Sequence, residues 1–428
     1  TGGQITPPIM GAAAFLMIEF LNLPYQSIVL AALIPASMHF FGVFWQVHFE
    51  ARKNGLKGIP VADLPKAREV IARDWPAAIP LVVLLMVLFS GFTPYLAAFW
   101  GITACVLVGF TKRNPVVAVG FLAVMIAAIA AGLLSEGWAT VAIALGVAAV
   151  CVAFALRDPE GKFLTADMVD AFVVGAKYAI AVGAAAATVG IIVGVVTLTG
   201  VGFKISNIVT SFAGQLAAIT GSILPAWAFD AKGMTLFFTL VMTAVVCILL
   251  GTGVPTTANY IIMVTVAAPS LALLGVEPIV AHFFVFYYGV LADITPPVAL
   301  AAYAAASMAG ADPFKTGNTA FRLGLAKALV PFVFVYGPAL LIVTKGFTWT
   351  DFFVTAATCA LGVFILAAAL TGYAIVRTPL WQRLSLGLSG LLLMAPNLTA
   401  SLIGIAIAVP AGLAQLAAYR SEKAAPAA

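Results

Sequence analysis

The sequence predicts an all-α protein that crosses a membrane many times. Of its 428 residues, 63% are apolar and 9% are charged, whereas a soluble chain carries about 45–50% apolar and about 25% charged residues. Mean hydropathy is +1.12. Apolar runs of about 20 residues, long enough to cross a bilayer as helices, recur along the chain. These observations exclude a soluble fold and disfavour a membrane β-barrel, and the net charge of +5 gives no indication of nucleic-acid binding.

The first third of the chain predicts six helices. Short turns separate them, apart from one charged stretch at residues 50–74 that holds six Lys and Arg residues. The other basic turns fall on the same side of the predicted crossings, and the positive-inside rule makes that side cytoplasmic. The predicted helices are 9–21, 27–45, 77–89, 95–110, 116–134 and 138–156.

The remaining two thirds begin with an amphipathic segment at residues 165–177, which predicts a helix lying along the membrane interface or a soluble connector. Further apolar spans follow, and residues 352–376 and 384–409 predict three more helices. The last residues, 421–428, are small and polar, which is typical of disorder. The predicted spans are 178–199, 206–223, 234–250, 260–274, 278–291, 298–308 and 320–344.

An internal repeat is the most informative feature of the sequence. The hexapeptide Gln-Ile-Thr-Pro-Pro-Ile that starts at Gln4 returns as Asp-Ile-Thr-Pro-Pro-Val at Asp293, and the same offset of 289 residues aligns Leu23-Pro24-Tyr25 with Asp312-Pro313-Phe314. Two related halves that carry matching Gly/Pro-interrupted apolar segments indicate a secondary transporter whose site lies near the bilayer midplane.

The prolines of both hexapeptides predict breaks in membrane helices. Proline has no N–H to donate to the carbonyl four residues earlier, so we expect the carbonyls of Gly3, Gln4, Ala292 and Asp293 to lack donors. Bare carbonyls at membrane depth need a partner, such as a small hard cation. We therefore expect them to bind a coupling ion, with Na⁺ as the candidate; no other cofactor is indicated.

A second kind of break follows the span 234–250. Gly-Thr-Gly-Val-Pro-Thr-Thr-Ala-Asn, residues 251–259, interrupts two apolar arms and predicts a re-entrant hairpin or a broken helix; a simple kink is the alternative. The C-terminal end of the first arm favours a cation, and the N-terminal end of the second favours a carboxylate. We expect cation contacts from Gly251, Thr252 and Val254. The expected substrate contacts come from Thr256, Thr257 and Asn259, together with Thr295 and Thr6 of the hexapeptides.

Ionisable residues within apolar runs are the remaining candidates. Asp293 adjoins the predicted break and is expected to bind a cation or exchange a proton, and Glu19 is a second proton candidate that could instead be an interfacial carboxylate. His39 and His282 titrate near neutrality but are more often packing residues. The four cysteines are widely spaced, and their spacing indicates neither a disulfide framework nor zinc.

Taken together, these motifs resemble the large membrane (permease) subunit of tripartite ATP-independent periplasmic (TRAP) transporters, most closely the TAXI type with fused membrane subunits. The resemblance rests on residues 1–8, 190–200, 251–257 and 292–297 and covers residues 1–344. It implies an inverted-repeat elevator-type symporter that imports small organic anions, such as C4 or C5 dicarboxylates or glutamate, with a sodium or proton gradient. A periplasmic substrate-binding protein and a small membrane subunit, separate or fused, are the implied partners. The implied location is the cytoplasmic membrane of a bacterium or archaeon.

The sequence also departs from the family pattern. A first hairpin precedes the first Thr-Pro-Pro segment in such proteins, so we expect an N-terminal portion to be missing here. The expected division is a first repeat with scaffold helices at residues 1–164, a second repeat at 165–349 and C-terminal extension helices at 350–428. The alternatives are a symporter that needs no binding protein and a non-transporting membrane scaffold. An enzyme is disfavoured because no catalytic constellation is visible.

Overall fold

The computed structural model describes residues 1–60, 63–111, 113–157, 161–223, 230–254, 256–395 and 397–424. In these residues the secondary structure is helical apart from one isolated β-bridge between Tyr373 and Arg377. Seven of the helices described are long and apolar enough to cross a membrane, or nine spans if two bent pairs each count as one. The predicted all-α polytopic fold is confirmed.

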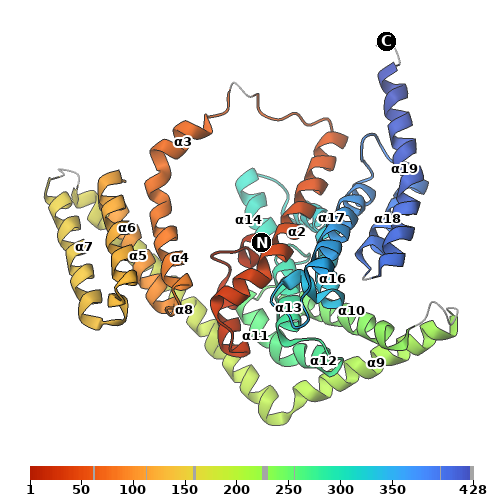
Figure 1. The fold of residues 1–428 in the computed structure, drawn as a ribbon, viewed down its shortest axis with the longest axis horizontal. Coiled ribbons are helices and arrows are strands. Elements are labelled where there is room, and N and C mark those ends of the chain that lie inside the picture. Colours follow the sequence, from red (N-terminus) through yellow and green to blue (C-terminus); the bar gives the residue numbers. More distant parts are fainter. Residues whose placement is uncertain are drawn as a thin grey trace. The chain divides into compact units, whose positions relative to one another are not determined.

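The chain forms two compact units (Figure 1). The first comprises Thr1–Leu23, Ser27–Lys57 and Ala185–Ala428, and the second comprises Pro24–Gln26 and Gly58–Ala184. These units follow contacts between helices, so the repeat boundaries expected at residues 164 and 349 stay a prediction.

Short turns join most of the successive helices of the second unit. Helix α4 packs on α5, and α5 packs on α7. Proline opens α5 and α6, where a missing N–H costs nothing, and Thr93 and Asn114 accept hydrogen bonds from the first turns. Its helices are α3 (Ala67–Asp74), α4 (Ile79–Phe89), α5 (Pro94–Phe110), α6 (Pro115–Ala130), α7 (Gly137–Arg157) and the first part of α8 (Gly161–Thr199).

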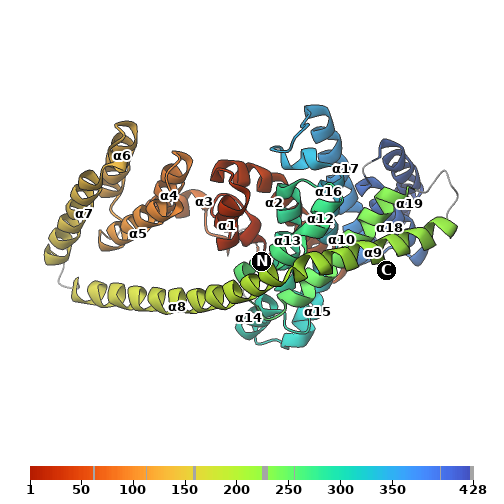
Figure 2. The ribbon, with the colours of Figure 1, turned by 90° about the horizontal axis from the view of Figure 1, so that it is seen from below.

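The structure contradicts the expected division of residues 165–199 into two helices. Residues 165–177 and 178–199 were expected as an interfacial helix followed by a separate span, yet they form one uninterrupted helix (Figure 2). No proline occurs between Gly161 and Thr199, and alanines fill much of the segment. Helix propensity therefore continues through the junction.

Helix α13 (Pro278–Ala292) lies at the centre of the first unit. Every residue from Ile279 to Ala292 is buried, so this helix is apolar on all sides, as expected of a core helix. Around it pack α10, α11, α12 and α16. The first unit contains α1 (Ala12–Leu21), α2 (Tyr25–Lys53), α9 (Val201–Ile223), α10 (Ala231–Gly251), α11 (Thr256–Val266), α12 (Ala268–Leu273), α13, α14 (Leu300–Ala309), α15 (Pro313–Leu323) and α16 (Val330–Tyr336).

The expected continuous span 320–344 is wrong. Helix α15 ends at Leu323, a short 3-10 turn runs through Ala326–Leu329, and α16 then leaves at an angle of 49°. At Gly324 a side chain would lie 2.8 Å from the Ile294 side chain, so the chain passes close to another segment at the bend. Pro331 and the pair Gly337-Pro338 keep the next helix short.

The three C-terminal helices are α17 (Trp349–Thr371), α18 (Leu380–Met394) and α19 (Leu398–Ala424), as the sequence predicts. They lie side by side (Figure 1) around a shared core of Ile365, Ala369, Leu386, Leu393 and Ala411. Glycines allow close approach: a side chain at Gly362 would lie 2.6 Å from Met394, and one at Gly404 3.0 Å from the Ser389 carbonyl. Close contact at small residues is the usual way that membrane helices associate.

Candidate functional site

The break between α10 and α11 lies where the glycine-rich motif predicts it. Helix α10 ends at Gly251 and α11 begins at Thr256. The Thr252 N–H and hydroxyl both donate to the Leu249 carbonyl, at 3.4 and 2.7 Å, and Gly253 has a φ of +81°, which favours glycine. Pro255, also part of the motif, lies outside the described residues.

Helix α10 meets two other segments at Gly251. A side chain there would lie 2.6 Å from the Ala292 methyl group and would collide with the Asn259 amide. Asn259 is fully buried, and its Nδ2 donates to the Cys247 carbonyl at 3.4 Å. Its Oδ1 has no hydrogen-bond partner among the described residues. The amide expected to contact substrate is therefore enclosed behind the break.

The second break follows α13. The Thr295 N–H donates to the Ala292 carbonyl at 3.0 Å, and the Ala301 N–H donates to the Asp293 carbonyl at 3.1 Å. The Thr295 hydroxyl donates to the Leu291 carbonyl at 2.8 Å. Turn hydrogen bonds thus replace the helical ones that proline removes.

The expectation of carbonyls without donors is therefore wrong for all four residues, because the first break behaves in the same way. There, the Thr6 N–H donates to the Gly3 carbonyl at 3.3 Å and the Gly11 N–H donates to the Gln4 carbonyl at 2.6 Å. A carbonyl oxygen has two lone pairs, so each can still accept a second partner.

Most hydrogen bonds of the two breaks match at an offset of 289 residues. The Thr6 hydroxyl donates to the Gly2 carbonyl, as Thr295 does to Leu291. The Met10 N–H donates to Thr6 and the Ala299 N–H to Thr295, each at 3.2 Å. Met10 and Ala299 both have positive φ, and the bonds Pro7-Pro8 and Pro296-Pro297 are both cis. The hydrogen bonds show that the sequence repeat is also a repeat of backbone structure.

The two breaks and the glycine-rich break converge on Asp293. Its Oδ2 accepts a hydrogen bond from Gln4 Nε2 at 3.3 Å and another from the Thr256 hydroxyl at 3.1 Å. Packing of α1 against α11 and α13 holds these segments together. A carboxylate, an amide and a hydroxyl from three separate parts of the sequence thus form one cluster of polar side chains within the first unit.

The other residues expected at the site lie around this group or apart from it. Thr256 and Thr295 are buried, Thr257, Val254 and Thr252 are half-buried, and Gly3 is exposed. Glu19 is exposed on α1 and makes no hydrogen bond or ion pair among the described residues, so the structure does not join it to Asp293. In the described part of the chain, no three His, Cys, Asp or Glu residues form a metal-binding group.

The sequence interpretation missed one buried polar cluster. Lys327 is 3% exposed, and its ammonium lies 2.8 Å from His39 Nε2. His39 Nδ1 lies 3.2 Å from the Tyr287 hydroxyl, which donates to the Lys327 carbonyl. The sequence feature that could have indicated this cluster is a single lysine, Lys327, within the apolar run 325–335. His282 is the packing residue that the sequence favours, because its Nδ1 lies 2.7 Å from the Tyr260 hydroxyl.

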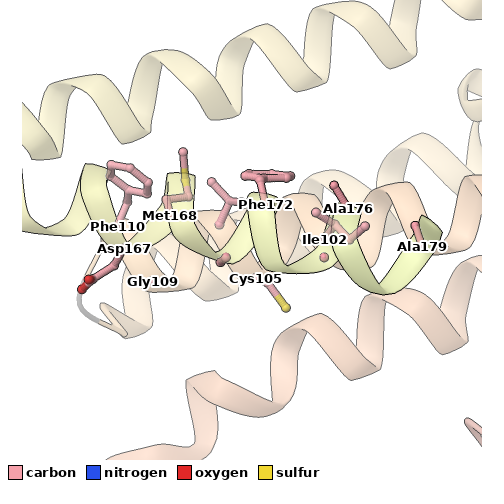
Figure 3. Close-up of a pocket in the computed structure, with 12 residues that line it drawn as sticks. Ile102, Cys105, Gly109, Phe110, Asp167, Met168, Phe172, Ala176 and Ala179 are labelled. Atoms are coloured by element: carbon pink, nitrogen blue, oxygen red, sulfur yellow. The ribbon is translucent and has the colours of Figure 1, made fainter. Parts of the chain in front are cut away.

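A cavity of about 860 Å³ lies in the second unit between α5 and α8 (Figure 3). Apolar side chains such as Ile102, Phe110, Met168 and Phe172 line it, and its single carboxylate, Asp167, lies at one end. Solute sites combine apolar walls with several convergent polar groups, which this lining lacks. The polar group at Asp293 is the better candidate for binding.

A many-helix membrane protein with two matched broken segments that meet at a half-buried cluster of polar side chains belongs to the class of membrane transporters. The chain matches the family model "Tripartite ATP-independent periplasmic transporter, DctM component" over residues 1–115 and 111–349, and it belongs to that family. Comparison with curated proteins and with solved structures found no match. The resemblance seen in the sequence is confirmed at the level of the permease component, and assignment to the TAXI type stays a prediction.

Proposed function

We propose that the protein is a secondary active symporter that imports small organic anions of the C4/C5 dicarboxylate or glutamate class with a cation gradient. The observation that carries this proposal is the convergence of Gln4 and Thr256 on Asp293. One carboxylate shared by three broken or interrupted segments changes its surroundings whenever any of them moves. A bound cation and a conformational change would therefore be linked at this point.

The same site supports a division of tasks. Asp293 would supply oxygen ligands for a cation such as Na⁺, together with backbone carbonyls of the three breaks, at Gly251, Thr252, Val254, Ala292, Gly3 and Gln4. Thr256 opens α11, and Thr257 lies in the same first turn. The N-terminus of a helix favours a carboxylate, so this turn would bind the anion, with Thr6 and Thr295 of the repeat as further contacts.

The proposed partners follow from the family. As one component of a tripartite system, the chain would work in the inner membrane with a periplasmic substrate-binding protein and a small membrane subunit. Movement of one repeat-built part against a fixed part, of the elevator kind, would carry the site across the bilayer. The energy would come from the cation gradient.

Reconstitution into vesicles tests the proposal. The protein, its small subunit and a candidate binding protein are combined, and uptake of labelled succinate or glutamate is measured under imposed sodium or proton gradients. We expect uptake that follows one gradient and requires the binding protein. Absence of uptake and of substrate exchange under both gradients would reject the importer.

Asp293→Asn tests the role of the carboxylate. The amide can still accept from Gln4 and Thr256, but it lacks the negative charge that attracts a cation. Two opposite unit charges about 4 Å apart attract by about 4 kcal/mol near a protein surface, so we expect the apparent affinity for the coupling ion to fall by about tenfold or more with the amount of folded protein unchanged. Asp170→Asn on α8, at an exposed position, is the matched control. Unchanged ion dependence in Asp293→Asn would contradict the role.

A further inference from the structure

Lys327, His39 and Tyr287 form a closed chain of polar groups inside the first unit. They come from the 3-10 turn after α15, from α2 and from α13, and each is at most 3% exposed. His39 Nε2 is the only hydrogen-bond partner of the Lys327 ammonium among the described residues. An ionisable side chain at membrane depth is costly and is functional by default.

The directions of the hydrogen bonds define how many protons the cluster holds. A lysine ammonium only donates, so His39 Nε2 must accept, which places the single proton of a neutral imidazole on Nδ1. That proton is donated to the Tyr287 hydroxyl, and the hydroxyl in turn donates to the Lys327 carbonyl at 3.2 Å. The cluster is satisfied with one positive charge, and a second charge on the imidazole would face the ammonium at 2.8 Å.

No described carboxylate neutralises this charge. Lys327 takes part in none of the ion pairs in the described ranges, and the nearest acid on its neighbour α2, Glu50, is paired with Arg322 and Lys53. Tyr288 on α13 and Cys359 on α17 are the other titratable side chains that interact with the cluster. Asp293 is held by Gln4 and Thr256. A buried ammonium without a counter-charge is costly, which favours its release of a proton once water can reach it.

The cluster packs on the first repeated break, and Gly324 lies between the cluster and the second. A side chain at Gly2 would lie 2.9 Å from the His39 ring, so the start of the first break packs directly on the imidazole. A Cβ atom added to Gly324 would lie 2.8 Å from the Ile294 side chain of the second break and 3.3 Å from the Lys327 side chain. Movement of either break therefore alters access to the ammonium.

We propose that Lys327, His39 and Tyr287 form a proton-binding site that couples uptake to a proton gradient, an inference that rests on the proposed importer. In the closed state the proton is held as an N–H bond of the Lys327 ammonium, with His39 Nε2 as acceptor. When the breaks move, water reaches Nζ and takes the proton: the N–H bond breaks, its electron pair stays on nitrogen, and an O–H bond forms on water. The neutral amine is reprotonated from the opposite compartment.

The variant Lys327→Arg tests the coupling of uptake to protons separately from the binding of substrate. Arginine keeps the positive charge and the donor toward His39, but it does not release its proton. In vesicles with the small subunit and binding protein, we expect net uptake of succinate or glutamate driven by a proton gradient to fall by about tenfold or more. Exchange of internal for external substrate, which needs no net proton movement, should stay within about twofold. Full proton-driven net uptake in Lys327→Arg would overturn the proposal.

A measurement without substrate tests the proton-binding site separately from the importer. In protein labelled with ¹⁵N-histidine, His39 is assigned by the loss of its signals in His39→Gln. Its nitrogen shifts are followed from about pH 6 to about pH 11, a range that includes the pKa values of unperturbed histidine, about 6.5, and unperturbed lysine, about 10.4. We expect a neutral ring protonated on Nδ1 and one step in the Nε2 shift as Lys327 loses its proton. Absence of the step in wild type would overturn the proton site even if uptake occurs.

Two further comparisons complete the design. The step should be missing in Lys327→Arg and present in Lys315→Arg, which changes an exposed lysine on α15 in the same way. A wild-type protein that shows the step but neither uptake nor exchange would support the proton site and reject the importer. Uptake driven only by sodium, without the step, would reject the proton site and retain the importer.

Discussion

At the scale of single residues, Gly251 defines the geometry of the candidate site. Only a hydrogen fits where α10 meets Asn259 and the last residue of α13. The sequence predicts Gly251 as a backbone ligand because it stands at an interrupted helix. What it cannot indicate is the close approach to Ala292, 41 residues later, since that contact depends on how three helices pack.

Gly251→Ala tests this close approach. An added methyl group would collide with the Asn259 amide and lie within 2.6 Å of the Ala292 methyl group, so α10 must shift. Overpacking of this kind typically costs about 1–3 kcal/mol, and we expect a lower unfolding temperature in detergent and weaker uptake.

The matched control is Gly214→Ala on α9, where nothing lies within 4 Å of the added carbon. Alanine is a better helix former than glycine, so the control should be neutral or stabilising by up to about 1 kcal/mol. Equal unfolding temperatures for the two variants would show that Gly251 has more room than the structure indicates.

At the scale of helices, the sequence predicts those whose ends carry punctuating residues. Helices α5, α7 and α13 begin and end within one residue of the predicted ranges 95–110, 138–156 and 278–291. Proline or glycine starts each of them. Predictions failed where the chain bends for tertiary reasons, as at Leu323, or continues without a marked junction, as in α8. Apolar composition alone does not distinguish a bend from a straight span.

The bend after α15 depends on Gln46 of α2. Its Nε2 donates to the Arg322 carbonyl at 3.0 Å, and its Oε1 accepts from the Ala326 N–H at 3.3 Å. These are backbone groups that a continuous helix would have paired internally. One buried amide therefore satisfies both sides of the break, and the salt bridge between Arg322 and Glu50 at 2.7 Å adds a second link to α2.

Gln46→Met keeps the volume but removes both hydrogen bonds. The Arg322 carbonyl still accepts from the Leu325 N–H at 3.3 Å, whereas the Ala326 N–H is left without a partner. A buried polar group left without a partner costs about 1–3 kcal/mol, so we expect a loss of stability of that order. The measurement is the unfolding temperature in detergent, compared with Gln215→Met on α9, which is exposed. A Gln46 variant as stable as the control would contradict the bridging role.

At the scale of the whole molecule, the C-terminal helices contact α2 as well as α16 and the 3-10 turns Ala326–Leu329 and Pro338–Leu341. Phe364 of α17 packs on Trp45 with ring centroids 4.6 Å apart and on Phe49 at 5.6 Å. Lys53 Nζ donates to the Thr371 carbonyl at 2.8 Å. The sequence predicts the three helices but offers no indication of this attachment, because aromatic contacts between distant segments leave no local pattern.

Phe364→Ala should loosen the attachment. Aromatic pairs contribute about 0.5–1.5 kcal/mol beyond the area they bury, and Phe364 loses two such contacts. We expect a destabilisation of about 1 kcal/mol or more and faster proteolysis between α16 and α17. Leu361→Ala, in the same helix but exposed, should leave both measurements unchanged. Equal effects of the two variants would show that the Trp45 contact contributes nothing.

The candidate site could be predicted only in part. Asp293 stands out as an ionisable residue in an apolar run shortly before Pro296-Pro297, and Thr256 because it follows Pro255 in the glycine-rich break. The repeat marks Gln4 as the counterpart of Asp293. Their meeting at one carboxylate could not be read from the sequence, and neither could the turn hydrogen bonds that satisfy the carbonyls. Both depend on the folded path of the backbone.

Gln4 leaves the ribosome 289 residues before Asp293. At about 5–20 residues per second, the first broken segment waits for roughly 15–60 seconds with its amide unmatched. Ribosomes that stall before α13 release membrane-inserted fragments carrying half of a binding site. We expect membrane quality-control proteases to degrade such fragments, because the hydrogen bond between Gln4 and Asp293 forms only after Asp293 has been synthesised.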